Sequence, residues 1–191
     1  MRVIAGSAKG RRLAEFSGRA IRPTPDRVRE ALFSILYSRG GLAAGGKVVD
    51  LFAGSGALGI EALSRGAAEG WFVDSSRDAV ATIRENLNRC SFSDKARILA
   101  RDVWEALPLL ADASPFDVIF ADPPYGRDHA SRLLEAIDRY RLLGKRGILC
   151  LETAASDPVP RQAGAIQLQD QRRYGLTMLH FYQHSAVEAP A

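Results

Sequence analysis

Cysteine and histidine are scarce in this chain, which has two cysteines and three histidines among its 191 residues. Cys90 and Cys150 lie far apart and form no C-x-x-C motif, so we expect reduced thiols that pack as small hydrophobic side chains. The histidines also lack the spacing of a ligand set: His129, His180 and His184. The sequence therefore predicts neither a metal site nor a disulfide framework.

Long apolar runs are absent as well. No stretch approaches the roughly 20 apolar residues that span a membrane, and residues 1–7 lack the apolar core of a signal peptide. The hydrophobic fraction of 47% and the charged fraction of 25% are typical of a globular domain. We find no internal repeat, linker or low-complexity segment. We expect a cytoplasmic monomer, not bound to a membrane, that folds as one domain with a small appendage.

Charge is distributed unevenly. Residues 1–29 carry eight Lys and Arg residues against Glu15 and Asp26, a net charge of +6, while the whole chain carries +4. Alternating apolar and basic groups predict a β-hairpin arm over residues 1–22, followed by a main domain over 23–184 and a frayed tail over 185–191. The charge of the arm favours a phosphate-backbone partner, although a solvated cluster with no partner explains it equally well.

A helix is predicted to begin just after the arm. Thr24 is a good N-cap, Pro25 suits the first helical position, and Asp26 favours the positive end of the helix. Polar and charged residues surround this helix start, and their pattern alone indicates capping and a surface ion pair: Arg22, Thr24, Arg27 and Glu30.

Residues 48–63 predict a buried strand, a glycine turn and a helix. Gly54 and Gly56 lack a Cβ, so the backbone and the free N–H groups of the helix start can approach a ligand closely. Gly59 would let the helix lie close to the sheet. Asp50, within the strand, is costly to bury unless N–H groups of the turn or a cationic ligand group bind it. The stretch therefore predicts a small-molecule site.

The turn alone does not identify the ligand. Residues 54–59 fit the dinucleotide pattern G-x-G-x-x-G, with Asp74, and Ser75 beside it, placed to hold a ribose hydroxyl. Asp50 favours S-adenosylmethionine over a nicotinamide cofactor, because a carboxylate attracts an ammonium and a sulfonium but repels a pyrophosphate. Asp102, after the third predicted strand, is a candidate acceptor for an adenine amino group. Asp74 and Asp102 also suit helix N-caps.

A second motif, Asp122-Pro123-Pro124-Tyr125, follows the predicted strand 116–121. The two prolines remove two N–H donors, so the loop presents carbonyl oxygens and the Asp122 carboxylate. Such acceptors suit an exocyclic amine, which must be held by hydrogen bonds and must lose a proton before it attacks well. Tyr125 is placed to stack on the base that carries the amine. The motif predicts a site that modifies a nucleobase.

The order of the predicted elements favours an α/β class, a doubly wound Rossmann-like fold. Its sheet is expected to be mostly parallel and seven-stranded, with an antiparallel C-terminal hairpin and the small N-terminal hairpin. The strands after the first are predicted at Trp71–Asp74, Ala96–Ala100, Phe116–Ala121, Gly147–Glu152, Ala165–Gln171 and Leu176–Gln183. The later helices are predicted at Arg77–Asn88, Val103–Leu110 and Arg127–Tyr140.

Several motifs occur in order along the chain: Arg22-Pro23-Thr24, Arg27-Val28-Arg29-Glu30, Asp50-Leu51-Phe52-Ala53-Gly54-Ser55-Gly56, Asp122-Pro123-Pro124-Tyr125 and Tyr174-Gly175-Leu176-Thr177. Together with Arg2-Val3-Ile4-Ala5-Gly6 and Gly10-Arg11-Arg12-Leu13, they resemble the RsmD-type 16S ribosomal RNA guanine-N2 methyltransferases. The resemblance covers essentially the whole chain. Its two central motifs are shared with many amino methyltransferases, and the N-terminal pieces narrow it to this family.

The resemblance implies a methyltransferase domain that transfers one methyl group from S-adenosylmethionine to N2 of a guanine in small-subunit ribosomal RNA, within a partly assembled subunit. The implied cofactor contacts are Asp50, Phe52, Ala53, Gly54, Gly56, Asp74, Ser75, Asp102 and Val103. The implied catalytic loop is Asp122, Pro123, Pro124 and Tyr125. The implied RNA contacts are Lys9, Arg11, Arg12, Arg22, Thr24 and Arg27.

Three alternatives remain open at this point. The same chemistry fits an amino methyltransferase that acts on adenine or cytosine of DNA or RNA. A nicotinamide-dependent oxidoreductase is disfavoured by Asp50 and by the absence of a Tyr-x-x-x-Lys proton donor. An RNA-binding module without activity would leave the acceptor loop without a use.

Overall fold

The computed structural model describes residues 1–15, 26–42, 44–124 and 129–185. Its helices are α1 (Asp26–Ser38), α2 (Ala57–Ser64), α3 (Arg77–Cys90), α4 (Val103–Leu110) and α5 (His129–Arg139), with a short 3-10 helix, η1 (Ser93–Lys95). Its strands are β1 (Lys47–Leu51), β2 (Glu69–Asp74), β3 (Ala96–Ala100), β4 (Phe116–Ala121), β5 (Leu143–Ala154), β6 (Gln162–Ala163), β7 (Ile166–Tyr174) and β8 (Thr177–His184). Among the described residues, no helix is long and apolar enough to cross a bilayer.

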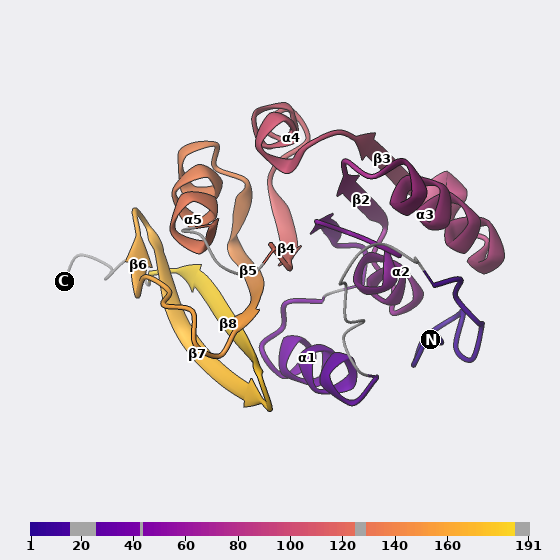
Figure 1. Cartoon of the computed structure of the whole chain (residues 1–191), viewed down its shortest axis with the longest axis horizontal. Helices are drawn as coiled ribbons and strands as arrows, with labels where there is room; N and C mark the ends of the chain where they lie inside the picture. Colours follow the sequence, from indigo (N-terminus) through magenta and orange to yellow (C-terminus); the bar gives the residue numbers. More distant parts are fainter. Residues whose placement is uncertain (16–25, 43, 125–128, 186–191) are drawn as a thin grey trace.

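The strands form one sheet in the order β3-β2-β1-β4-β5-β8-β7-β6 (Figure 1). Strands β1 to β5 pair in parallel, and β8, β7 and β6 continue the sheet with antiparallel pairing. The strand order reverses at β1, between β2 and β4, which is the point where doubly wound sheets bind ligands. The Rossmann-like prediction and the C-terminal hairpin are therefore confirmed.

The sheet has one strand more than predicted. Gln162 and Ala163 pair with Gln167 and Ile166 across a tight turn at Gly164, whose φ is +56°. A pairing of two residues is too short to give a periodic hydrophobic pattern, so the sequence could not reveal it.

Each face of the sheet is covered by its own helices. Helices α1, α2 and α3 pack with Val48, Phe72, Val118 and Ile148 in one hydrophobic cluster. Helices α4 and α5 pack on the opposite face with a second cluster: Val49, Leu51, Val73, Ile119 and Leu149. Neighbouring strand residues alternate between the two clusters, as the period-two geometry of a strand requires. Because helices cover both faces of the sheet, the place left for a ligand is beyond the carboxyl ends of the parallel strands.

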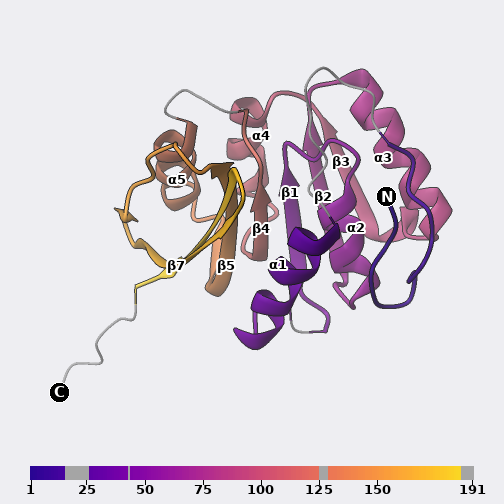
Figure 2. The same ribbon diagram turned by 60° about the horizontal axis from the view of Figure 1, so that its bottom comes forward.

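The described part of the N-terminal segment, residues 1–15, pairs over a shorter stretch than the predicted hairpin. Arg2 and Arg12 form one antiparallel bridge, and three backbone hydrogen bonds join the two arms: Val3 N to Arg11 O, Gly10 N to Val3 O and Leu13 N to Met1 O. Val3, Ala8 and Leu13 are buried in the cluster of α1, α2 and α3, so the segment is part of the main core. It lies beside α2 and α3, at the opposite side of the molecule from β7 (Figure 2). A two-stranded ribbon is marginal alone, so this short pairing depends on packing against the helices.

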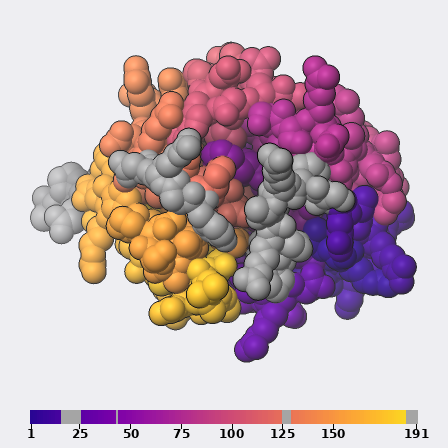
Figure 3. Space-filling view, in the orientation of Figure 1, coloured from indigo at the N-terminus to yellow at the C-terminus, as the bar shows by residue number. Residues whose placement is uncertain are grey.

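Glu61, Ser64 and Asn86 fix this segment to the core. The Glu61 carboxylate accepts from the backbone N–H groups of Ile4 at 2.7 Å and Ala5 at 3.0 Å. Ser64 Oγ accepts from Ala8 N at 2.9 Å and donates to Ala5 O at 2.5 Å. In the space-filling view the segment (indigo) packs against the molecule at the side away from the C-terminal strands (Figure 3).

Candidate active site

The glycine turn after β1 has the backbone geometry that its sequence predicts. Gly54 and Gly56 have φ of +55° and +74°, in the left-handed region that glycine adopts without strain. A Cβ on Gly59 would lie 2.4 Å from Phe72 Cε1, so only glycine allows α2 to pack this closely on β2. The turn also holds Phe52 at φ +60°, which is unusual for a side chain of this size.

Asp74, at the end of β2, holds this turn in place. One carboxylate oxygen accepts from Gly54 N at 2.8 Å, and the other accepts from Ser76 N at 2.8 Å. The N-cap of α3 is Ser76, whose hydroxyl accepts from Ala79 N at 3.3 Å, so the alternative interpretation of Asp74 as this N-cap is wrong. Ser75, beside Asp74, is exposed. Asp74 therefore lies at the mouth of the turn, where its sequence position predicts a ribose contact.

Three carboxyl groups gather where β1, β4 and β5 end. Asp50 is buried and accepts from Gly59 N at 2.9 Å. Ala121 pairs with Leu151, which brings Asp122 next to Glu152 in the following row. Side chains two residues apart on a strand share a face, so both carboxyl groups lie on the same face of the sheet as Asp50. Asp50 and Asp122 were predicted as site residues from the sequence, whereas Glu152 was not.

Burial dominates the titration of this cluster. It raises the pKa of Asp50 to about 8, and the nearby Asp74 charge adds to the shift while the Gly59 hydrogen bond opposes it. Burial also raises the pKa of Asp122 well above its usual range, with further contributions from the charges of Glu152 and Asp50. Buried carboxylates in such proximity favour a bound cation, because a positive charge restores what they lose in hydration.

The loop after β4 begins with Asp122 and two prolines. Pro123 is buried and Pro124 is exposed, and neither has an N–H to donate. Tyr125, the predicted stacking residue, lies outside the described residues. Asp122 lies in register with Glu152, and the acceptor role of the loop stays a prediction.

An aromatic cluster borders the site, and only its member Phe52 was predicted from the sequence. The rings of Trp104 and His129 are stacked with centroids 5.8 Å apart, and Phe52 meets Trp104 edge-on at 6.5 Å. The Arg132 guanidinium lies 4.0 Å from the Trp104 ring centroid. Asp102 begins α4 as its N-cap and accepts from Trp104 N at 2.8 Å, and Val103 is buried. The N-cap interpretation of Asp102 is thus confirmed, while its predicted contact with adenine stays a prediction.

The predicted RNA contacts are spread over the surface of the N-terminal half. Lys9, Arg11 and Arg12 are exposed on the N-terminal segment, and Arg27 is exposed on α1. Arg11 also donates to the backbone carbonyl of Arg89. Arg22 and Thr24 lie outside the described residues. These exposed cations are accessible to a polyanion, as the charge distribution suggested.

Arg29, unlike its exposed basic neighbours, is buried. It is 1% exposed, donates to Arg2 O and forms an ion pair of 3.0 Å with Asp26. Burial is the main cause that lowers its pKa. It holds the N-terminal segment to α1 and does not belong to the solvated charge of the arm.

The two cysteines are buried free thiols, as predicted. Burial raises the pKa of Cys90 and, more strongly, that of Cys150, so neither is poised as a thiolate nucleophile. Within the described part of the chain, no group of three His, Cys, Asp or Glu side chains has the arrangement of a metal site.

Known proteins resemble this chain over nearly its full length. A family model described as conserved hypothetical protein 95 matches residues 1–183. A Bacillus subtilis protein named "Putative rRNA methyltransferase YlbH" is 39% identical over 96% of this chain and 98% of its own length. Ribosomal RNA small subunit methyltransferase D of Haemophilus influenzae is 30% identical over 96% of this chain and 94% of its own length.

Solved structures have the same architecture. One described as "Putative methyltransferase yhhF" from Escherichia coli has a TM-score of 0.83 and 30% identity, covering 97% of this chain and 98% of its own. A hypothetical protein from Thermus thermophilus has a TM-score of 0.81 and 31% identity, covering 96% of this chain and 99% of its own.

Proposed function

The chain belongs to the conserved hypothetical protein 95 family, and we propose that it transfers a methyl group from S-adenosylmethionine to the exocyclic N2 amine of a guanine in small-subunit ribosomal RNA. The observation that carries the proposal is the row of acceptors at the ends of β4 and β5, beside the glycine turn after β1. An amine and a cationic cofactor would meet there. The names of the relatives, which include rRNA methyltransferases, support the same substrate class.

The residues present fit S-adenosylmethionine. Asp50 is buried and its pKa is raised to about 8, and a ligand that carries an ammonium and a sulfonium would stabilise its carboxylate form. Asp74 and the turn at Gly54 would hold the ribose, and the aromatic rings of Phe52 and Trp104 would border the adenine. When bound, the cofactor supplies an electrophilic methyl group.

Asp122 would act on the amine of the target base. Its carboxylate and the Pro123 carbonyl can each accept one N–H hydrogen bond, which fixes the direction of the nitrogen lone pair. The raised pKa of Asp122 makes its carboxylate a stronger proton acceptor than an ordinary aspartate. The loop therefore positions the amine and takes its proton, and no covalent enzyme intermediate is needed.

The base must leave its stack to reach this edge, as enzymes that modify bases require. Tyr125 would stack on the flipped guanine, and exposed cations of the N-terminal segment would bind the RNA backbone. We infer that the substrate is a partly assembled small subunit, that the enzyme acts as a monomer, and that it works in the cytoplasm, where such particles occur.

The alternatives receive less support. A pyrophosphate beside Asp50, Asp122 and Glu152 would meet no cation among these described residues and would oppose the ionisation of their carboxyl groups, which disfavours a nicotinamide cofactor. Adenine and cytosine also carry exocyclic amines, so the acceptor loop alone does not reject them, and the product must be identified.

The test is transfer of labelled methyl from S-adenosylmethionine to small subunits purified from cells that lack this protein, followed by nucleoside analysis. We expect N2-methylguanosine in the small-subunit RNA. Naked RNA in a parallel reaction should accept less label if a partly assembled particle is the substrate. Label on adenine or cytosine, or no transfer together with no cofactor binding by calorimetry, would contradict the proposal.

A further inference from the structure

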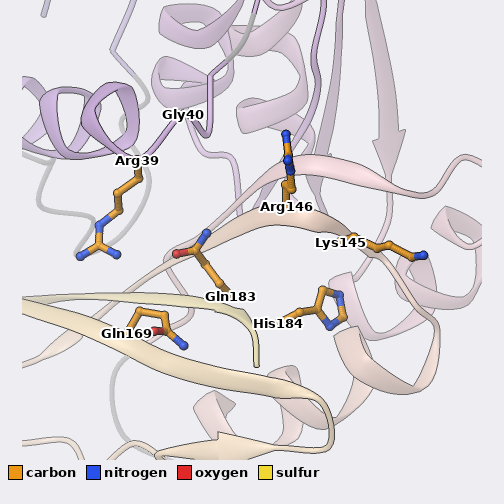
Figure 4. A pocket seen from close by; sticks show the side chains of 7 residues that line it. All are labelled: Arg39, Gly40, Lys145, Arg146, Gln169, Gln183 and His184. Atoms are coloured by element: carbon orange, nitrogen blue, oxygen red, sulfur yellow. The ribbon is translucent and has the colours of Figure 1, made fainter. Parts of the chain in front are cut away.

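A basic pocket lies at the end of the sheet opposite the acceptor loop. Its volume is about 460 Å³, and the described residues that line it are Arg39, Gly40, Lys145, Arg146, Gln169, Gln183 and His184. Arg39 lies on one side of Gln183, and Lys145 and Arg146 lie on the other (Figure 4). None of these lining residues is acidic, and three carry a fixed positive charge.

A bulge in β5 presents two of the cations. Leu143 pairs with Phe116 and Ile148 pairs with Val118, so residues 144–147 lie opposite the single residue Asp117. Bulges of this kind redirect side chains out of the regular pleat. Gly147 is required there, because a Cβ would lie 2.8 Å from Phe116 O and 2.9 Å from Gly144 N.

A second bulge presents a polar side chain to the same pocket. In β7, Leu168 pairs with Tyr182 and Asp170 pairs with Phe181, which leaves Gln169 as the extra residue. Two independent irregularities of the sheet therefore meet at one place. Regular strands would have kept both sets of side chains in the pleat.

The cations that line the pocket differ in whether they already form ion pairs within the protein. Arg39 forms an ion pair of 2.9 Å with Asp170, which also pairs with Arg172. Lys145 and Arg146 are exposed and form no ion pair with any other residue that the structure describes. His184 donates from Nε2 to Leu143 O at 3.0 Å, so its other ring nitrogen remains for a ligand.

We propose that this pocket binds a backbone phosphate of the RNA substrate, away from the base that is methylated. Guanidinium and ammonium groups with amide donors beside them suit a phosphate, whereas pockets for organic cofactors are lined mainly by apolar and aromatic side chains. The proposal rests on the proposed function for the identity of the polyanion.

The distance from the acceptor loop indicates its role. Arg146 precedes Glu152 by six residues on β5, a separation of at most about 20 Å, because the bulge shortens the rise along the strand. A phosphate in the pocket therefore belongs to a part of the RNA several nucleotides from the target, or to another strand. The pocket orients the substrate and takes no part in methyl transfer.

The test replaces both bulge cations, Lys145→Gln with Arg146→Gln, and measures binding of small-subunit RNA at several salt concentrations. Each lost phosphate contact lowers the slope of log K against log salt by about 0.7–0.9. We expect the slope of log K against log salt to fall in magnitude by the amount that corresponds to one or two phosphate contacts. The affinity for RNA should be about tenfold lower at low salt, with a raised KM for RNA. The affinity for S-adenosylmethionine should be unchanged.

The matched control is Lys95→Gln with Arg97→Gln, two exposed cations at the end of η1 and in β3, and β3 is an edge strand of the sheet. This control removes the same charge. If the salt slope falls equally in both variants, the proposal that the pocket binds a backbone phosphate is overturned. An unchanged slope in the bulge variant also overturns it.

A titration of the wild-type chain with inorganic phosphate, followed by NMR, distinguishes a small ligand from RNA. Tight phosphate binding that the bulge variant loses, with RNA binding intact, assigns the pocket to a small phosphorylated molecule and overturns the proposal. Failure of methyl transfer by the wild-type chain contradicts the proposed function and leaves the salt slope as the measure of the pocket.

Discussion

The side chain of Asn86 on α3 joins the N-terminal segment to the glycine turn. Its Nδ2 donates to Ser55 O at 2.9 Å and to Ala14 O at 3.1 Å, while its Oδ1 accepts from Ala14 N at 2.7 Å. The Asn86 side chain is buried and its partners Ala14 and Ser55 are half-buried, so these bonds are partly shielded from water. The segment that carries Arg11 and Arg12 is thus connected through one amide to the turn that would bind the cofactor.

Asn86→Ala should make both the N-terminal segment and the glycine turn more mobile. It leaves the N–H of Ala14 and two carbonyls without partners in a buried place, which costs about 1–3 kcal/mol of unfolding free energy. We expect faster hydrogen exchange at Ala14 and a weaker affinity for S-adenosylmethionine. Asn88→Ala, an exposed change on the same helix, is the control. Normal exchange protection at Ala14 in the Asn86 variant would contradict the connection.

Asp122→Ala should separate catalysis from cofactor binding. Loss of the proton acceptor is expected to lower kcat by about 10²–10⁴-fold, while the affinity for S-adenosylmethionine changes little, since Asp50 and Asp74 remain. Calorimetry and methyl transfer on the same preparation measure the two quantities. Equal loss of both would mean that Asp122 belongs to the cofactor site.

Glu152→Gln should shift the pH profile of the reaction. The charge of Glu152 raises the pKa of Asp122, and Asp122 must be ionised to accept a proton. Removing that charge lowers the pKa, so the acid limb of kcat/KM against pH should move to lower pH, while the cofactor affinity is maintained. Glu135→Gln, an exposed change on α5, should leave the limb in place. A limb that moves to higher pH would refute the assignment.

Asp50 should make the ligand-free protein less stable as pH rises. Its pKa is raised from 3.8 to about 8 on folding, so between these values the folded state holds a proton that the unfolded state has released. The contribution of Asp50 to the free energy of unfolding is therefore complete below the unfolded-state pKa of 3.8. It is lost as the pH rises toward the folded-state pKa, by an amount on the order of 5 kcal/mol.

Urea unfolding at several pH values measures this loss. Asp50→Asn removes the titrating group, and its stability should vary less over the same range. Asp112→Asn, at an exposed aspartate, should follow the wild type. A wild-type stability that rises steadily from about pH 4 to pH 8 would exclude the raised pKa of Asp50.

Arg11→Gln with Arg12→Gln should weaken RNA binding at the other end of the molecule. Both side chains are exposed on the N-terminal segment. Removal of two phosphate contacts lowers the salt slope by about 1.4–1.8. Combining these changes with Lys145→Gln and Arg146→Gln should add the two effects, because the sites are far apart. An unaltered slope would remove the segment from the RNA interface.

Local sequence rules predicted much of the fold. β3, β4 and α4 lie at their predicted bounds, because apolar runs between turn residues and a helix start at Asp102 are local signals. The antiparallel C-terminal strands followed from the lack of a helix between them. Gly59 was predicted to allow close packing, and its contact with Phe72 confirms this.

Contacts that depend on the order of the strands in the sheet could not be predicted from the sequence. Glu152 was predicted only as the end of a strand, and its position beside Asp122 follows from the pairing of β4 with β5. The stacking of Trp104 with His129 joins α4 to α5. The burial of Arg29 likewise depends on the docking of the N-terminal segment. No local pattern encodes such contacts.

The anchoring of the N-terminal segment also bears on how the chain is made. The bond between Ala14 and Asn86 spans 72 residues of sequence, so a ribosome that adds ~5–20 residues per second needs about 4–14 s to supply the partner. The Arg11 bond to Arg89 waits longer still, across 78 residues. The partners of this segment therefore become available in stages, first Glu61 and Ser64 and only later Asn86 and Arg89.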